Sequence, residues 1–105
     1  MPFHASIASV KGAIEGLTRS LAAEFAPKIR VNAIAPSLTE TGLAKALLSD
    51  DKKREAAAQR HPLKRFGIAR DVAAAAVFLL DGSSGWVTGQ VIPVDGGMSA
   101  LRTFR

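Results

Sequence analysis

The side chains most able to bind or react in this 105-residue chain lie in two places. Lys11 stands in a segment whose apolar residues recur every three or four positions. Ser37, Thr39 and Thr41 follow a short apolar run that ends at Pro36. An ammonium group and hydroxyl groups can hold a polar ligand, but Lys11 could equally be a solvated helix residue, and Ser37 or Thr39 could cap a helix. The residue types alone therefore fit both a ligand site and an ordinary turn.

The first segment predicts a helix from Ser6 to Phe25. Its large apolar residues share one face at spacings of three and four: Ile7, Val10, Ile14, Leu17 and Leu21. Lys11 lies on another face of the same helix. Pro27 ends the helix, because proline lacks an N–H group and disfavours helical geometry in the residue before it.

The remaining elements alternate between strand and helix. In order, the patterns predict a buried strand over Ile29–Ala35, a short helix over Thr39–Leu48, a polar helix over Asp50–Arg60, a helix over Arg70–Leu80 and a strand over Trp86–Val94. Asp50 or Asp51 is expected to cap the polar helix. In the helix after it, Val72, Ala76 and either Leu79 or Leu80 are expected to face inward. Pro93 favours a sheet edge for the last strand, because it cannot donate to a ladder. Buried Asn32 would need hydrogen-bond partners. This order indicates an α/β fold with a parallel sheet, and two strands are too few for a sheet that is stable alone.

Composition excludes several classes of function. The net charge is +5, with most of the excess between Lys45 and Arg70. That excess fits a solvated face or a surface for an anionic cofactor or substrate; nucleic acid is not expected, because no aromatic residues interleave with the basic ones. No stretch reaches the roughly 20 apolar residues that span a bilayer, so no membrane contact is expected. The chain has no cysteine, so it has no disulfide, thiolate nucleophile or thiolate zinc site. No metal site is predicted. A cytoplasmic location is expected.

Three segments resemble one family of enzymes. They are SVKGAIEGLTRSLAAE (residues 9–24), RVNAIAPSLTET (30–41) and VTGQVIPVDGG (87–97), which are similar to the catalytic helix, the PG turn and the C-terminal VDGG strand of short-chain dehydrogenases/reductases. HPLKRFG (61–67) resembles a further part of the family pattern. The resemblance implies the distal half of a Rossmann-like doubly wound parallel sheet, with two strands and three to four helices, incomplete alone. The family's Gly-rich GxxxGxG segment is absent, so residues 1–105 would be the C-terminal part of a single domain.

The resemblance also implies site residues and a cofactor. Lys11 lands on the catalytic lysine that binds the nicotinamide ribose of NAD or NADP. The residues that would border the cofactor are Pro36, Ser37, Thr39 and Thr41. In the family a tyrosine four residues before the lysine is the general acid, but Ile7 stands there and the chain has no tyrosine.

Further departures from the family concern glycine positions and the proton donor. Ser37 replaces the glycine of the PG turn and would be strained if that position needs a positive φ. Lys64 stands at another position where glycine is usual. His4 is an alternative acid or a plain surface residue, and His61 is expected to be structural.

Two classes of function are therefore open. One is an NAD(P)-dependent oxidoreductase that moves hydride between nicotinamide and a small carbonyl or alcohol, here truncated, lacking its tyrosine and expected to be inactive as this chain alone. The other is a non-catalytic α/β module that buries its apolar helix face against copies of itself or a partner chain. A homo-oligomer is expected in either case. We also expect Met1 to be a misassigned start, a truncation or the edge of a fragment.

Overall fold

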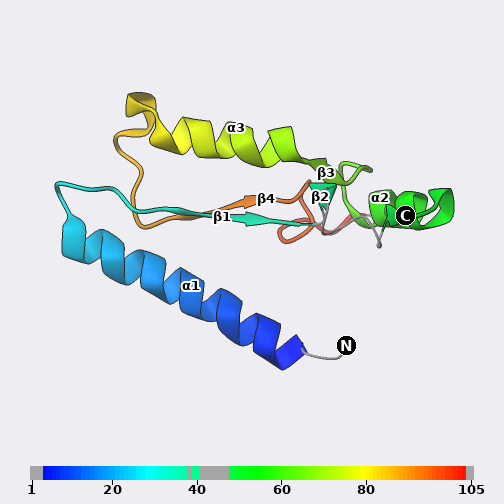
Figure 1. Cartoon of the computed structure of the whole chain (residues 1–105), viewed down its shortest axis with the longest axis horizontal. Helices are drawn as coiled ribbons and strands as arrows, with labels where there is room; N and C mark the ends of the chain where they lie inside the picture. The colour runs from blue at the N-terminus through cyan, green and yellow to red at the C-terminus, as the bar shows by residue number, and fades with distance from the viewer. Residues whose placement is uncertain (1–3, 38, 41–47, 104–105) are drawn as a thin grey trace. The chain divides into compact units, whose positions relative to one another are not determined.

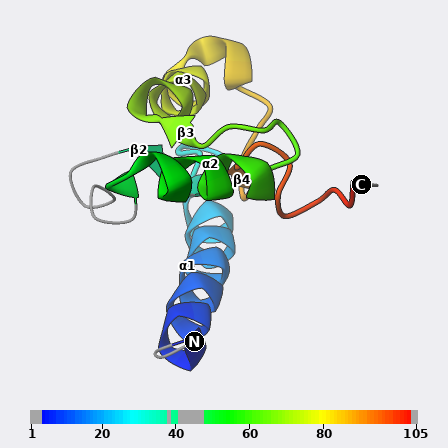
Figure 2. The same cartoon turned by 90° about the vertical axis from the view of Figure 1, so that its right-hand side faces the viewer.

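The computed structural model describes residues 4–37, 39–40 and 48–103. Within these ranges the chain forms three α-helices and four short strands (Figure 1, Figure 2). It divides into two compact units, one made of Met1–Ala33 with Leu79–Ile92 and the other of Ile34–Phe78 with Pro93–Arg105. None of the described helices is long and apolar enough to cross a lipid bilayer.

Helix α1 runs over His4–Phe25 in the first unit, which confirms the helix expected from the apolar spacing and its end before Pro27. Thr18 and Ala22, each 5% exposed, are buried on this helix. The Thr18 hydroxyl donates to the Ile14 carbonyl at 2.7 Å, so its polar atom is satisfied within the helix itself.

The predicted apolar face of α1 is largely uncovered. Val10, Ile14 and Leu17 are 58%, 50% and 57% exposed. Burial of such side chains is the main favourable term in folding, and this helix leaves much of it unused. That is the behaviour expected of an α/β fold that is incomplete alone.

The first strand begins later than its apolar run, because side chains hold the residues before it. Val31 N donates to the Thr88 hydroxyl at 3.1 Å instead of to a ladder carbonyl. The Asn32 amide donates to Val87 O at 3.1 Å and accepts from Gln90 N at 3.0 Å. Asn32 therefore has the hydrogen-bond partners that its position requires.

Strands β1 (Ala33–Pro36) and β4 (Val91–Val94) form one two-stranded sheet. Two backbone hydrogen bonds bracket the ladder: Ala33 N to Gln90 O at 2.9 Å and Ser37 N to Val94 O at 3.3 Å. Both partners advance by four residues in the same direction, so the strands are parallel, as Figure 1 shows. Each strand of a two-stranded sheet is an edge, which is where Pro93 was expected to lie.

Strand β4 is shorter than the predicted Trp86–Val94, because turns occupy the residues before it. A 3₁₀ helix covers Gly82–Ser84, and Val87 N donates back to Ser84 O at 2.9 Å. Gly89 has a φ of 72°, a left-handed conformation that glycine adopts without strain.

The second unit holds a further pair of strands that the sequence patterns miss. β2 (Thr39–Glu40) pairs in parallel with β3 (Gly67–Ile68), with Thr39 opposite Gly67 (Figure 2). The helix predicted from Thr39 is therefore wrong at its start, because pairing with a distant segment overrides local propensity. Residues 41–47 of that predicted helix lie outside the described residues.

Helices α2 and α3 follow their predictions closely. α2 spans Asp51–Arg60, and the Asp50 carboxylate caps it by accepting from Lys53 N at 2.7 Å. α3 spans Ala69–Leu80. Leu79 is half-buried, whereas Leu80 is 85% exposed, which settles which of the two faces inward.

Candidate functional site

The turn after β1 brings three of the predicted cofactor residues together in the second unit. Pro36 is exposed at the end of β1, and Ser37 follows it. The Thr39 hydroxyl donates to the Ser37 carbonyl at 3.0 Å, which closes the turn. Among the described residues other than glycine, only Lys64 has a positive φ, so Ser37 occupies this turn without left-handed strain.

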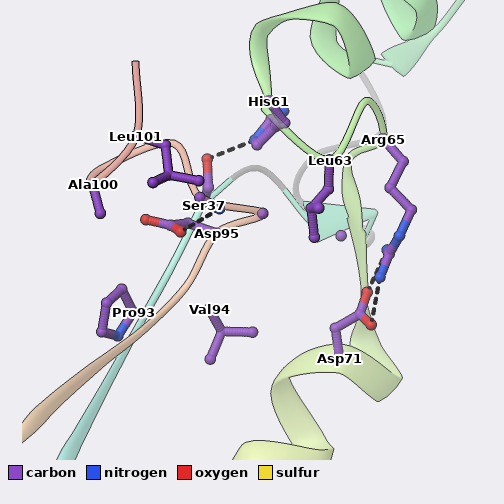
Figure 3. Close-up of a pocket in the computed structure, with 13 residues that line it drawn as sticks. Ser37, His61, Leu63, Arg65, Asp71, Pro93, Val94, Asp95, Ala100 and Leu101 are labelled. Carbon is purple, nitrogen blue, oxygen red and sulfur yellow. Dashed lines mark hydrogen bonds and ion pairs between the residues drawn. The ribbon is translucent and has the colours of Figure 1, made fainter. Parts of the chain in front are cut away.

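His61 is a buried polar residue beside this turn, at 2% exposed. Its Nδ1 lies 2.8 Å from the Ala57 carbonyl oxygen, and its Nε2 lies 2.9 Å from Ser37 Oγ (Figure 3). A carbonyl can only accept, so Nδ1 carries the proton, and in the neutral ring Nε2 accepts from the Ser37 hydroxyl. Ser37 Oγ also lies 3.4 Å from Met98 Sδ, a weaker acceptor.

A cleft of about 550 Å³ opens beside the Ser37–His61 pair (Figure 3). Its apolar walls come from Leu63, Pro93, Val94, Ala100 and Leu101. Its polar side chains are Ser37, His61, Arg65, Asp71 and Asp95. Pockets that combine an apolar lining with a few polar groups are typical of small-molecule sites.

The turn after β4 forms one side of this cleft and is held by Asp95. Its carboxylate accepts from Gly97 N at 2.9 Å and from Ser99 N at 3.1 Å. A hydrogen bond from the Ser99 side chain is the main cause that lowers the pKa of Asp95. The backbone N–H groups of Ser99 and Gly97 act in the same direction, and burial opposes them. Gly96 and Gly97 have φ values of 62° and 89°, so the turn depends on glycine at both positions.

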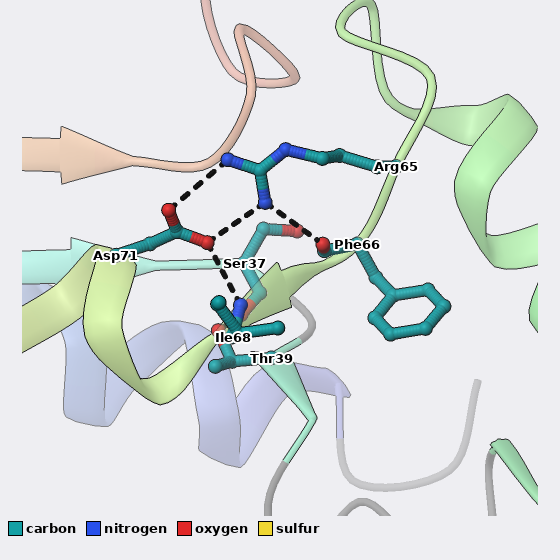
Figure 4. Close-up of polar contacts among 6 residues, drawn as sticks. All are labelled: Ser37, Thr39, Arg65, Phe66, Ile68 and Asp71. Atoms are coloured by element: carbon teal, nitrogen blue, oxygen red, sulfur yellow. Dashed lines mark hydrogen bonds and ion pairs between the residues drawn. The ribbon is translucent and has the colours of Figure 1, made fainter.

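Arg65 and Asp71 form a bidentate ion pair at the opposite side (Figure 4). The Arg65 Nη atoms lie 2.8 Å and 3.0 Å from the two carboxylate oxygens, and Asp71 also accepts from Ile68 N at 2.8 Å. The bond from Arg65, followed by that from Ile68, lowers the pKa of Asp71 to about 2. The two charges neutralise each other, so this wall attracts neither anions nor cations strongly.

Lys11 lies in the first unit, exposed on α1. The helix places Ile7 and Lys11 four residues apart and hence on one face. His4 is the first residue of α1. Thr41, the remaining predicted cofactor residue, lies outside the described residues.

The described residues fit one end of a dinucleotide better than the other. The hydroxyl groups of Ser37 and Thr39 lie just past the carboxyl end of a parallel strand, where ligands bind to α/β sheets. A pyrophosphate favours a helix N-terminus without negative charge. The first turn of α2 is flanked by Asp50 and Asp51 and that of α3 contains Asp71, so these two helices do not offer a phosphate site.

Two polar pairs of this region were not expected to form a site. His61 was expected to be structural, and its bond to Ser37 spans 24 positions. Arg65 and Asp71 have opposite charges six positions apart, a spacing that is not diagnostic of contact outside a helix. Only the chain path around β3 brings that pair together.

Comparison with known proteins identifies the family. A family model described as enoyl-(acyl carrier protein) reductase matches residues 1–99. The chain belongs to this family, within the short-chain dehydrogenases/reductases.

Individual relatives match this chain along most of its length. Two relatives come from Xanthobacter autotrophicus: 2-(S)-hydroxypropyl-CoM dehydrogenase 3 and inactive 2-(S)-hydroxypropyl-CoM dehydrogenase 2. Each is 42% identical to this chain over 106 residues. Each match covers 96% of this chain but only 42% of the first relative and 46% of the second. The solved gluconate 5-dehydrogenase from Burkholderia cenocepacia, in complex with NADP and tartrate, is 35% identical with a TM-score of 0.81, covering 90% of this chain and 38% of that one. The chain thus spans less than half of their length, and its assignment to the distal part of a Rossmann-like fold is confirmed.

Proposed function

We propose that residues 1–105 form the C-terminal part of a single Rossmann-like domain, whose whole protein moves hydride between a nicotinamide cofactor and a small carbonyl or alcohol. The observation that carries this proposal is family membership over residues 1–99, joined to the hydroxyl-bearing turn at the end of β1. The relative solved with NADP supports a nicotinamide dinucleotide, NAD or NADP, as the cofactor class.

In this proposal the residues of the chain bind and orient the cofactor. The exposed Lys11 ammonium group donates hydrogen bonds to the nicotinamide ribose. Pro36, Ser37 and Thr39 border the nicotinamide, together with Thr41. The bound cofactor supplies or accepts the hydride, while the protein orients it against the substrate.

The chain lacks the family's proton donor. Ile7 occupies the position of the general acid on α1, one helical turn before Lys11, and isoleucine has no exchangeable side-chain proton. We therefore propose that this chain alone does not reduce carbonyl compounds. Equal identity to a relative named as a dehydrogenase and to one named as inactive is compatible with this reading.

A cofactor titration tests the proposal. NADH and NADPH are titrated into the purified chain while the fluorescence of Trp86, which is fully exposed, and of the nicotinamide is followed. We expect saturable binding that Lys11→Gln weakens about tenfold, as the loss of a charged hydrogen bond implies. Lys28→Gln removes the same charge from another exposed lysine and should bind as the parent does. Absence of binding at millimolar cofactor would contradict cofactor binding by this chain.

A second candidate function is association, and the exposed apolar residues favour it. Val10, Ile14 and Leu17 stand half exposed on α1, and contiguous exposed apolar surface marks interaction sites. The chain would then act as a cytoplasmic homo-oligomer without catalysis. Sedimentation velocity should show an oligomer that Ile14→Glu dissociates and Ser20→Glu, at an exposed polar position of α1, leaves intact. A monomeric parent chain would exclude this function.

A further inference from the structure

We propose that His61 is a positioning residue that ties the turn after β1 to the end of α2, so that the order of one depends on the order of the other. In its cofactor arm this inference rests on the proposed function, because Ser37 is there assigned to the border of the nicotinamide. The tie itself lies wholly within the second unit and is testable without a ligand.

The first support is that both ring nitrogens of His61 are used. The Ala57 carbonyl, in the last turns of α2, fixes the proton on Nδ1 at 2.8 Å. Nε2 is then left as an acceptor, 2.9 Å from Ser37 Oγ. A ring that only filled space could be apolar, whereas this ring, which is itself 2% exposed, joins two segments by two specific hydrogen bonds.

The second support is that a third segment meets the same residue. The residues after His61 turn back, with Lys64 N on His61 O at 2.8 Å and Leu63 N on Gly96 O at 3.1 Å. A Cβ atom built on Gly96 would lie 3.5 Å from His61 Cβ, so the glycine turn packs directly on the histidine. His61 therefore stands where the end of β1, the end of α2 and the turn after β4 meet.

The third support is the poor alternative open to Ser37. Without His61 its hydroxyl keeps the Met98 sulfur at 3.4 Å, a weak acceptor in an exposed contact. Among the described residues, no other hydrogen bond of the Ser37 side chain holds it toward α2. Loss of the histidine bond should therefore loosen the turn and the end of α2 together.

Two substitutions separate the two hydrogen bonds of the ring. His61→Asn keeps a donor at about the position of Nδ1, which can still reach Ala57, but it ends short of Ser37. His61→Gln is one methylene longer and places its amide near the position of Nε2. Ser37→Ala removes the other partner, and Ser37→Thr retains a hydroxyl group.

Hydrogen exchange of backbone amides tests the tie in the chain without ligand. We expect the amides of Ser37 and His61 to exchange about 3- to 10-fold faster in His61→Asn and in Ser37→Ala, the effect of losing one net hydrogen bond. His61→Gln and Ser37→Thr should restore part of the protection. The Ala26 amide, bonded to Ala22 O in the first unit, is the internal control and should not change. Faster exchange at Ser37 without a change at His61 would overturn the proposal.

Imidazole nitrogen NMR gives an independent readout that a space-filling role would not produce. The ¹⁵N spectrum of the parent chain should show His61 with its proton on Nδ1, and an Nε2–H tautomer would overturn the proposal. In the cofactor arm, Ser37→Ala should weaken NADPH binding about 3- to 10-fold and Ser37→Thr should recover it. If the parent chain binds no NADPH, the proposed function fails, whereas the exchange and tautomer data still decide the role of His61.

Discussion

The Arg30 guanidinium donates to the Leu79 carbonyl at 3.0 Å, although 49 positions separate the two residues. The same group reaches Ser84 O at 3.0 Å, Val87 O at 3.1 Å and, at 3.5 Å, Asp81 O. The last carbonyls of a helix have no partner within the helix, and a cation there also complements the helix dipole. α3 has no basic residue of its own in its last turn, so Arg30, from the segment that follows α1, supplies this C-terminal cap.

Arg30→Met should lower the free energy of unfolding by about 2 kcal/mol, because it leaves several carbonyls without their charged donor. Urea denaturation followed by circular dichroism measures the change. Arg30→Lys keeps the charge but presents a compact ammonium group in place of the planar fork, and it should recover only part of the loss. A Met variant as stable as the parent would show that water replaces the donor at no cost.

Lys64→Gly should stabilise the chain by about 0.5–1 kcal/mol. Lys64 has a φ of 61°, a left-handed conformation that costs a residue with a Cβ atom roughly 1–2 kcal/mol, partly offset by the greater freedom of glycine in the unfolded chain. Lys64→Asn, which tolerates this conformation, should stabilise less, and Lys64→Val should destabilise. Thermal unfolding ranks the three variants, and a Gly variant less stable than the parent would contradict the prediction.

The Arg65–Asp71 pair predicts a loss of stability in acid. The pKa of Asp71 is lowered from 3.8 to about 2 by Arg65 and the Ile68 N–H. A group whose pKa is lower in the folded state contributes stability above its unfolded pKa and loses it as pH falls through the folded one. The melting temperature should therefore fall between about pH 4 and pH 2, and both Asp71→Asn and Arg65→Met should flatten that fall. The same slope in all three proteins would assign the acid sensitivity to other carboxylates.

Gly97→Ala and Gly12→Ala should act in opposite directions. At Gly97 a Cβ atom would lie 2.9 Å from Leu101 Cδ1 and 3.3 Å from Pro62 Cβ, with a φ of 89°. We expect a loss of about 1–3 kcal/mol for Gly97→Ala. At Gly12, in α1, a Cβ atom would meet nothing within 4 Å, and alanine should gain up to about 1 kcal/mol of helix propensity. Equal effects at both sites would contradict the packing of the turn after β4.

Ile7→Tyr tests the missing acid. If the proposed function holds, the tyrosine stands one helical turn before Lys11, and in the whole protein it should raise carbonyl reduction with NADPH by about 10²-fold or more, the usual contribution of a positioned general acid. Ile7→Phe is the control of similar size without the hydroxyl group. Equal rates in the Tyr and Phe variants would show that more than the acid is missing.

Several elements could be predicted because their causes are local. The spacing of Val10, Ile14 and Leu17 with Pro27 beyond them predicts α1, and Asp50 predicts the start of α2. Helical hydrogen bonds and caps join residues three or four positions apart, so residues that are close in the sequence determine where these helices form. The family resemblance rests on longer runs of the same kind, and the family model confirms it.

The sequence by itself determined the α/β class, the family, the absence of the tyrosine and the ends of three helices. The tertiary structure alone decided that Thr39–Glu40 is a strand, that His61 meets Ser37 and that Arg30 caps α3. These contacts join residues 24 to 49 positions apart. The free energy of each contact depends on its burial and on which distant residue the folded chain brings within reach. A pattern of neighbouring residues does not encode which distant residue that is.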